Sequence, residues 1–178
     1  MIRDGLRGEF GPSEDELGAN LAGLFSERHG EIARLLGRAQ ELGLRIQQSI
    51  RLPFVLCHGD LHLANVMLDS RDNLFVIDWD QPVLAPMERD LLFVAGSARE
   101  SVFLDGYGAA AVDPTVIAYY RYEWAVQEIG DYAERIVGRP DLDDETRRMA
   151  LVGLRSVFEP GGDAETAYRA GAGLRLSS

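Results

Sequence analysis

Hydrophobic residues recur at steps of three and four along the first fifty residues, which is the pattern of amphipathic helices. A capping box at Ser13 and Glu16 predicts where the helical region begins. Leu52-Pro53 predicts its end, because proline disfavours helix at the residue before it. The apolar stripe that would be buried comprises Leu17, Leu21, Leu24, Phe25, Ile32, Leu35, Leu36, Ala39, Leu42, Ile46 and Ile50. Residues 1–12 are glycine-rich and polar, so we expect a loose lead-in.

The second half of the chain carries two helix starts. Asp113-Pro114 is a typical N-cap and N1 pair, and it predicts one long helix from Val116 to Val137. Asp143 is the expected N-cap of a further helix, which would bury Met149, Val152, Leu154 and Phe158. We expect a short terminal helix over residues 163–174. Residues 96–112 contain several glycines and a run of alanines, so they are predicted to form a loop.

Three short apolar runs in the middle of the chain predict strands instead: Phe54–Cys57, Val66–Leu68 and Leu74–Ile77. Residues 69–73 are rich in turn formers, so the second and third strands are expected to form a hairpin. The predicted fold is therefore α+β and mostly α-helical, with a small β-hairpin. The length allows one domain over residues 1–178.

Polar residues cluster where these strands end. His58, Asp60 and His62 follow the first strand, and Asp78 follows the third. The hairpin would return Asp78 toward Asp60 and Asn65. Two carboxylates and a carboxamide are hard oxygen ligands of the kind that Mg²⁺ takes from a protein, with water and phosphate completing its octahedron. The pattern therefore predicts a magnesium site.

Composition and charge narrow the function classes. The one cysteine, Cys57, cannot form an internal disulfide, which fits a reducing cytoplasm. No apolar run approaches the roughly 18 residues of a membrane span. The net charge of −11 argues against nucleic-acid and anionic-membrane partners and favours a cationic small-molecule substrate. Solubility alone explains this acidity equally well.

The segment His58-Gly59-Asp60-Leu61-His62-Leu63-Ala64-Asn65, followed by Ile77-Asp78-Trp79-Asp80, resembles the catalytic core of the aminoglycoside phosphotransferase/choline kinase family. The continuation from Pro82 to Leu91 is most similar to the spectinomycin phosphotransferase branch. This resemblance implies the C-terminal lobe of a protein-kinase-like fold. It also implies an antibiotic-resistance kinase, which transfers phosphate from ATP or GTP to an aminoglycoside or aminocyclitol hydroxyl.

The same resemblance implies roles for individual residues. Asp60 would be the catalytic base, and Asn65 and Asp78 would hold Mg²⁺. The Asp-x₄-Asn step and the 13-residue gap from Asn65 to Asp78 match the kinase spacing. His58 and Asp90 would brace the catalytic loop, Asp90 by hydrogen bonds to its backbone. His62 would either brace the loop or be exposed to solvent.

The long helix offers a candidate substrate surface. Tyr120, Glu123, Gln127 and Asp131 recur at steps of three and four, so they share one helix face. Aromatic and acidic groups together suit an ammonium-bearing ligand. The alternative is that the aromatic residues of this helix, Tyr119 and Trp124 among them, belong to the core.

All 18 basic residues are arginine, and the chain contains no lysine. Kinase-like enzymes hold the nucleotide phosphates with a lysine and a glycine-rich loop of their N-terminal lobe, and neither precedes His58 here. We therefore expect that the N-terminal nucleotide lobe is absent from these residues, and that an upstream or separate polypeptide supplies it. The chain would then be inactive alone.

Two alternatives stay open. The first is a truncated or pseudokinase lobe that binds a small molecule or a partner without catalysis. The second is a metal-dependent hydrolase, because His58, Asp60 and His62 alternate and would share one face of a true strand. A hydrolase site would need further ligands, and His29 is the one histidine that remains.

Overall fold

The computed structural model describes residues 2–7, 15–49, 52–80, 82–108, 112–139 and 141–174. Most of them are helical, as the sequence predicts, and the strands form two small antiparallel sheets where the sequence predicts one hairpin. The helices are α1 (Ile2–Leu6), α2 (Glu16–Ser49), α3 (Glu88–Leu91), α4 (Glu100–Tyr107), α5 (Pro114–Ala133), α6 (Asp144–Ser156) and α7 (Asp163–Gly171). A π-helical turn, Glu134–Gly138, extends α5.

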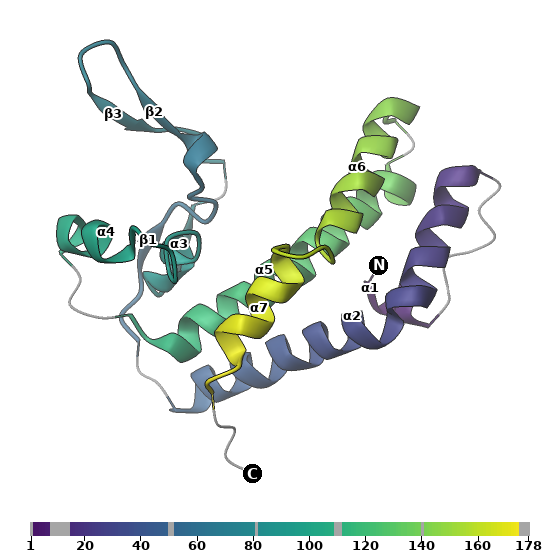
Figure 1. The fold of residues 1–178 in the computed structure, drawn as a ribbon, viewed down its shortest axis with the longest axis horizontal. Coiled ribbons are helices and arrows are strands. Elements are labelled where there is room, and N and C mark those ends of the chain that lie inside the picture. The colour runs from purple at the N-terminus through teal and green to yellow at the C-terminus, as the bar shows by residue number, and fades with distance from the viewer. Residues whose placement is uncertain are drawn as a thin grey trace.

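Helices α2 and α5 form the centre of a helical body that also contains α1, α6 and α7 (Figure 1). The predicted stripe of α2 is buried against α5, because one residue in every three or four faces the partner helix. The shared core includes Leu21, Phe25, Ile32, Leu35 and Leu42 from α2, and Ala118, Tyr122, Ala125, Ile129 and Ala133 from α5.

The helix starts follow local capping chemistry. The Asp113 carboxylate accepts hydrogen bonds from the backbone of Thr115 and Val116, and the Asp143 carboxylate accepts one from Thr146, so both predicted N-caps are confirmed. At the start of α2, the Asp15 carboxylate accepts the Gly18 N–H at 2.7 Å. The predicted caps at Ser13 and the stripe residue Ile50 lie outside the described residues.

Three predictions about the helices are wrong. The predicted loose lead-in over residues 1–12 contains α1, whose Ile2 and Leu6 pack against the core. Met149 and Val152 are about 60% exposed, at 61% and 59%, because α6 turns a different stripe toward the core. That stripe consists of Ala150, Leu151, Leu154 and Val157. The predicted loop over residues 96–112 contains α4, which ends at Gly108 in the left-handed conformation (φ 78°) that glycine adopts without strain.

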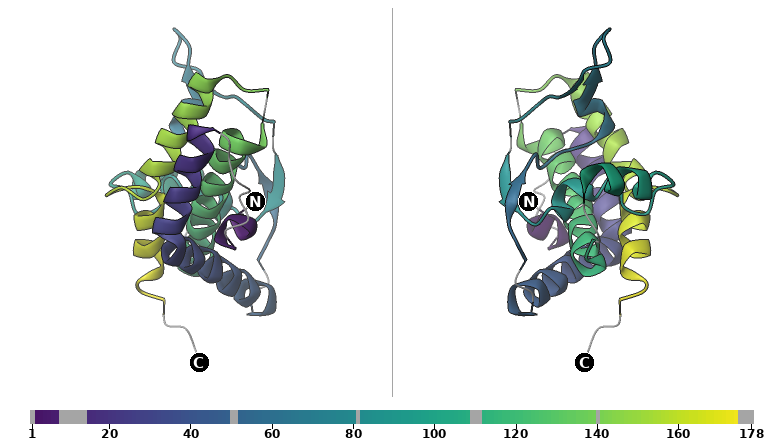
Figure 2. Two further views of the ribbon diagram at one scale, coloured as in Figure 1. Left: turned by 90° about the vertical axis from the view of Figure 1, so that its right-hand side faces the viewer. Right: turned by 90° about the vertical axis from the view of Figure 1, so that its left-hand side faces the viewer.

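The strands form two separate ribbons. Strand β2 (Val66–Leu68) pairs antiparallel with β3 (Leu74–Val76), which confirms the predicted hairpin. The Asp69 carboxylate closes its turn by accepting the backbone N–H groups of Arg71 and Asn73. Strand β1 (Val55–Cys57) pairs antiparallel with β4 (Val83–Ala85), which the sequence did not predict. The β2–β3 hairpin projects beyond the helices in all three views (Figures 1 and 2).

Candidate functional site

The predicted catalytic loop, residues 58–65 (called the catalytic loop below), connects β1 to the hairpin. Gly59 takes a positive φ of 87°, which glycine tolerates best, at the point where the chain turns away from β1. The backbone N–H of His62 then donates to the Asp60 carbonyl at 3.0 Å, and that of Asn65 donates to the His62 carbonyl at 3.0 Å. These bonds close the loop into a compact turn that carries three polar side chains.

Asp90 holds the start of this loop. One of its carboxylate oxygens accepts the His58 backbone N–H at 2.7 Å, and the other accepts that of Gly59 at 2.9 Å. Both oxygens are therefore committed to the backbone of the loop. This is the geometry expected for a residue that positions the loop from α3 rather than for one that reacts.

His58 connects the loop to the end of β3. Its side chain is 2% exposed, and its Nδ1 accepts the Asp60 N–H at 3.3 Å. Nε2 therefore carries the ring proton, which it donates to the Ile77 carbonyl at 2.8 Å. Because both nitrogens are engaged within the chain, His58 is placed to brace the loop next to Asp78, and neither nitrogen is left for a metal.

The two carboxylate oxygens of Asp60 lie in different surroundings. Oδ2 lies 3.5 Å from Nε2 of His62. Oδ1 is buried and has no hydrogen-bond partner among the described residues. A buried carboxylate oxygen without a donor is unfavourable, so this atom is the one best suited to receive the hydroxyl of an incoming ligand.

A backbone hydrogen bond links Asn65 to Ile77, the residue before Asp78. The Asn65 side chain is 6% exposed, and its Nδ2 donates to the Asp60 carbonyl at 2.9 Å, which leaves its amide oxygen available. The Ile77 N–H donates to the Asn65 carbonyl at 3.0 Å. Asp78 follows with a φ of 65°, and strained backbone of this kind is concentrated at functional sites. Convergence of these oxygens on one ion stays a prediction.

The donor set fits magnesium better than a transition metal. An amide oxygen and a carboxylate are ligands that Mg²⁺ takes, with phosphate and water completing the shell. Within the described ranges, the structure gathers no group of three His, Cys, Asp or Glu side chains that could hold a metal ion. The His58-x-Asp60-x-His62 alternation therefore forms no such cluster there.

The predicted substrate face of α5 is only partly open. Tyr120 is 8% exposed and packs in a second core cluster with Cys57, Ala85, Leu92 and Val116, so its ring is a core side chain rather than an open wall. Burial raises the pKa of the Cys57 thiol to about 11, as expected for a packing residue.

Glu123 already has partners in the chain. Its carboxylate lies 3.4 Å from the Arg89 guanidinium and accepts the Tyr119 hydroxyl at 3.3 Å. Burial raises the pKa of Tyr119 to about 12, and the Glu123 charge adds to that effect. Gln127 is half-buried and Asp131 is exposed, so Asp131 is the carboxylate of this face most open to a ligand.

Phe93 is a site residue that the sequence did not reveal. Its ring lies 5.9 Å from the His62 ring and 5.0 Å from the Trp124 ring, both edge to face. It thus joins the catalytic loop to α5. In sequence it lies within the apolar run that follows Asp90, where nothing distinguishes it from an ordinary core residue.

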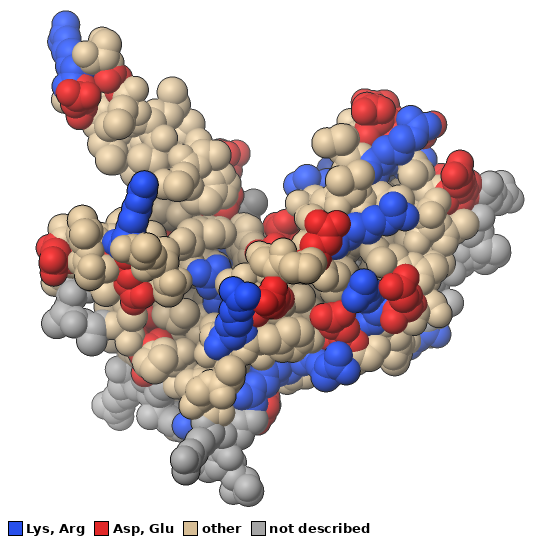
Figure 3. All heavy atoms as spheres, in the orientation of Figure 1, with Lys and Arg blue, Asp and Glu red and all other residues tan. Residues whose placement is uncertain are grey.

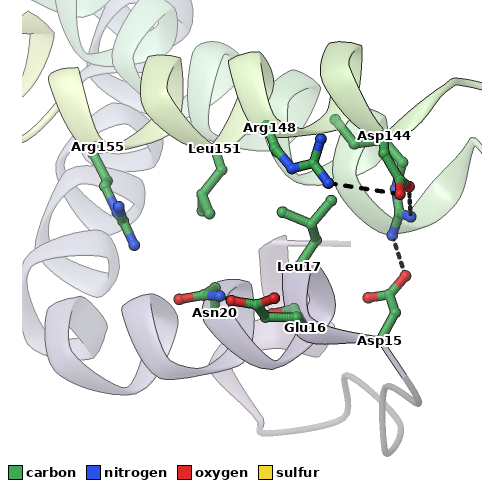
Figure 4. Close-up of a pocket in the computed structure, with 9 residues that line it drawn as sticks. Asp15, Glu16, Leu17, Asn20, Asp144, Arg148, Leu151 and Arg155 are labelled. Carbon is green, nitrogen blue, oxygen red and sulfur yellow. Dashed lines mark hydrogen bonds and ion pairs between the residues drawn. The ribbon is translucent and has the colours of Figure 1, made fainter.

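A charged pocket lies elsewhere, between the start of α2 and α6 (Figure 4). Its lining shares no residue with the predicted site. Arg147 pairs there with both Asp15 and Asp144, and Arg148 reaches Asp144 at 3.8 Å. These charges satisfy one another and tie α2 to α6, so we assign this pocket a structural role.

No helix in the described part of the chain is long and apolar enough to cross a membrane.

Comparisons with known proteins place the chain in a family. Two solved structures of spectinomycin phosphotransferase, APH(9)-Ia, are similar to the chain. For the complex with ADP and spectinomycin, the TM-score is 0.76 at 30% identity, over 95% of this chain and 55% of that one. For the AMP-bound complex, the TM-score is 0.75 at 32% identity, over 94% and 55%. The chain thus spans about half the length of these relatives.

Among curated proteins, no match was found. The model of the phosphotransferase enzyme family matches residues 7–127, which include the catalytic loop, the hairpin and most of α5. The match covers more than half of the sequence. The chain therefore belongs to the phosphotransferase enzyme family.

Proposed function

We propose that this chain is the catalytic and acceptor-binding lobe of an ATP-dependent kinase for cationic small molecules of the aminocyclitol or aminoglycoside type. The observation that carries the proposal is Asp60, whose Oδ1 is buried without a partner while His58 and Asp90 hold its loop. The similar solved structures are named for complexes with ADP, AMP and spectinomycin, which supports this choice of donor and acceptor.

In the proposed reaction, Oδ1 of Asp60 accepts a hydrogen bond from the acceptor hydroxyl. The hydroxyl oxygen attacks the γ-phosphorus of ATP, the bond from that phosphorus to the bridging oxygen breaks, and ADP leaves. The hydroxyl proton passes to Asp60. Because the transition state of phosphoryl transfer is loose, holding the hydroxyl in line matters more than the strength of the base.

The residues at the end of the hairpin fit a magnesium ion. The Asn65 amide oxygen and the Asp78 carboxylate would hold it, and when bound it would neutralise charge that develops on the phosphates. The chain's own contribution is the backbone bond from Ile77 to Asn65, which keeps these two ligands on adjoining segments.

The absence of lysine limits how well this lobe alone could hold the nucleotide phosphates. Kinase-like enzymes clamp the β- and γ-phosphates with a lysine, and none of these 178 residues is a lysine. We therefore propose that another segment, on the same or a separate polypeptide, supplies the clamp, in the cytoplasm where ATP is available. The same observation favours a second candidate, a non-catalytic lobe that binds the small molecule only.

The test joins this chain to the part of spectinomycin phosphotransferase that it does not match, and measures phosphate transfer from radiolabelled ATP to spectinomycin. We expect transfer by the joined protein and little by the 178-residue chain alone. Asp60→Asn should lower kcat by about 100-fold or more, the usual contribution of a general base, and leave the KM for ATP nearly unchanged.

The matched control is Asp105→Asn, which makes the same chemical change at an exposed position on α4. It should keep full activity. Equal kcat values for the parent and Asp60→Asn would refute the catalytic role. Spectinomycin binding without transfer by any form would favour the non-catalytic lobe.

A further inference from the structure

A second hollow is lined in part by Phe93. It has a volume of about 580 Å³ and is bounded by the segment after α3, the first half of α5 and α7. This size is typical of small-molecule sites, which occupy roughly 300–1,000 Å³. Phe93, Pro114, Ile117 and Ala170 give it apolar walls. None of the residues predicted for catalysis or metal binding lines it.

One charged group in this groove lacks a close counterion. The Arg121 guanidinium is half-buried, and its Nη2 donates to the Ala95 carbonyl at 3.2 Å. Among the described residues, no carboxylate lies within ion-pair distance of it, and Asp163 acts on it only from further away. Burial lowers the pKa of Arg121, which shows that the surroundings do not fully compensate its charge.

The other charged side chains of the groove have partners within the chain. The Glu100 carboxylate accepts the backbone N–H of Gly96 at 2.7 Å. Arg169 pairs with Glu165 one helical turn away. Arg121 therefore remains as the cation that a ligand could neutralise. A guanidinium has five N–H donors, and two of them can bind both oxygens of one carboxylate.

We propose that this groove binds a small amphipathic carboxylate, with the acid on Arg121 and the apolar body against Phe93 and Ile117. The site is distinct from the acceptor site, where acidic groups favour a cation. It does not depend on the proposed kinase function. The edge contact between Phe93 and His62 makes Phe93 a wall shared by the groove and the catalytic loop.

The experiment titrates the 178-residue chain with phenylacetate and with phenethylamine, which share a ring and carry opposite charges, and follows amide chemical shifts by NMR. We expect saturable shifts at the groove with phenylacetate and none with phenethylamine. Arg121→Met should weaken phenylacetate binding about tenfold, because it removes a charge-assisted hydrogen bond. Arg99→Met, an exposed arginine outside the groove, should leave the affinity unchanged.

A second variant covers the case in which Arg121→Met does not fold. Ala170→Phe keeps Arg121 and fills the groove from α7, and it should weaken phenylacetate binding at least as much. Saturable binding that both variants leave intact, or no saturable binding by the parent chain, would overturn the proposal. Competition between phenylacetate and spectinomycin would overturn it too, since the groove would then belong to the acceptor site.

Discussion

At the scale of single residues, the site depends on groups that do not react. Both carboxylate oxygens of Asp90 accept hydrogen bonds from the backbone of His58 and Gly59. Both ring nitrogens of His58 form hydrogen bonds, one with Asp60 and one with Ile77. Asp60 is left with one oxygen that nothing in the described residues satisfies. The atom proposed to receive the acceptor hydroxyl is therefore the Asp60 oxygen that these neighbours leave without a donor.

Replacing Asp90 tests this arrangement without any activity assay. Asp90→Asn puts an NH₂ group where one acceptor oxygen was, so one loop N–H loses its partner. We expect the free energy of unfolding to fall by about 1–3 kcal/mol, the usual cost of a buried unsatisfied group. Urea denaturation measures it, with the exposed Asp105→Asn as control. Equal destabilisation by both variants would contradict the role assigned to Asp90.

Asp163, the first residue of α7, gives a prediction about pH. Burial raises its pKa in the folded state, although Arg121 and a hydrogen bond with Trp124 oppose this. An acid whose pKa is higher in the folded than in the unfolded state favours folding at low pH. It loses that stabilisation as pH rises from about 4 through the folded-state pKa.

The free energy of unfolding of the parent chain, minus that of Asp163→Asn, should therefore fall as pH rises through this window and then stay constant. Urea denaturation at a series of pH values measures the difference. A difference that increases with pH would show that the Arg121 and Trp124 interactions outweigh burial.

At the scale of elements, the start of α5 connects two parts of the site. The Asp113 carboxylate caps α5 at Thr115 N (2.7 Å), and the Asp113 N–H donates to the buried Glu88 carboxylate at 3.0 Å. Helix α3, which carries Asp90, is thereby fixed to the helix that carries Trp124. Asp113→Ala should lower the free energy of unfolding by about 1 kcal/mol, the typical value of an N-cap. Asp113→Asn, which can still cap the helix, should lose much less free energy of unfolding in the same denaturation assay. Equal losses in Asp113→Ala and Asp113→Asn would refute the capping role.

The elements that sequence predicts well are those that local chemistry decides. The caps at Asp113 and Asp143 and the turn at Asp69 involve atoms a few residues apart, and each is present. The pairing of β1 with β4 sets Val55 opposite Ala85 and Cys57 opposite Val83, residues far apart in the sequence, so no local pattern marks it. The buried stripe of α6 depends on which way the helix rotates against α5, and two alternative stripes of apolar residues fit the sequence.

The predicted catalytic motif stands out in the sequence because its spacing is local, whereas its surroundings do not. Tyr120 and Glu123 have the spacing of one helix face, yet Tyr120 is drawn into the core and Glu123 toward Arg89. Phe93 reaches the site only because α3 packs against α5, a tertiary contact that the run of apolar residues around it does not encode.

At the scale of the whole molecule, the net charge of −11 predicts a salt-dependent affinity for cations. Acidic and basic side chains are nevertheless interspersed on the face seen in Figure 3. The same view shows an open gap between the hairpin and the helical body, separate from the groove at Arg121. We expect spectinomycin binding to weaken from 0.05 to 0.5 M NaCl in calorimetry, because screening shortens the reach of exposed charges.

Asp131→Asn should weaken that binding several-fold, and Glu123→Gln should do so less, because Glu123 already pairs with Arg89. Glu145→Gln, an exposed position at the start of α6, is the charge-matched control. Unchanged affinity in both α5 variants would return this helix face to a purely structural role.

The exposed hairpin has a thermodynamic consequence for the proposed metal ligand Asp78. Met67, Leu68, Leu74 and Phe75 are exposed, so both faces of β2–β3 are apolar and open to solvent. A two-stranded hairpin is only marginally stable without a covering surface, and Asp78 follows directly from it. Whatever covers the hairpin will therefore also order Asp78. Because coupling between two binding events is reciprocal, magnesium bound as proposed would tighten the covering contact by the same factor by which that contact tightens magnesium binding.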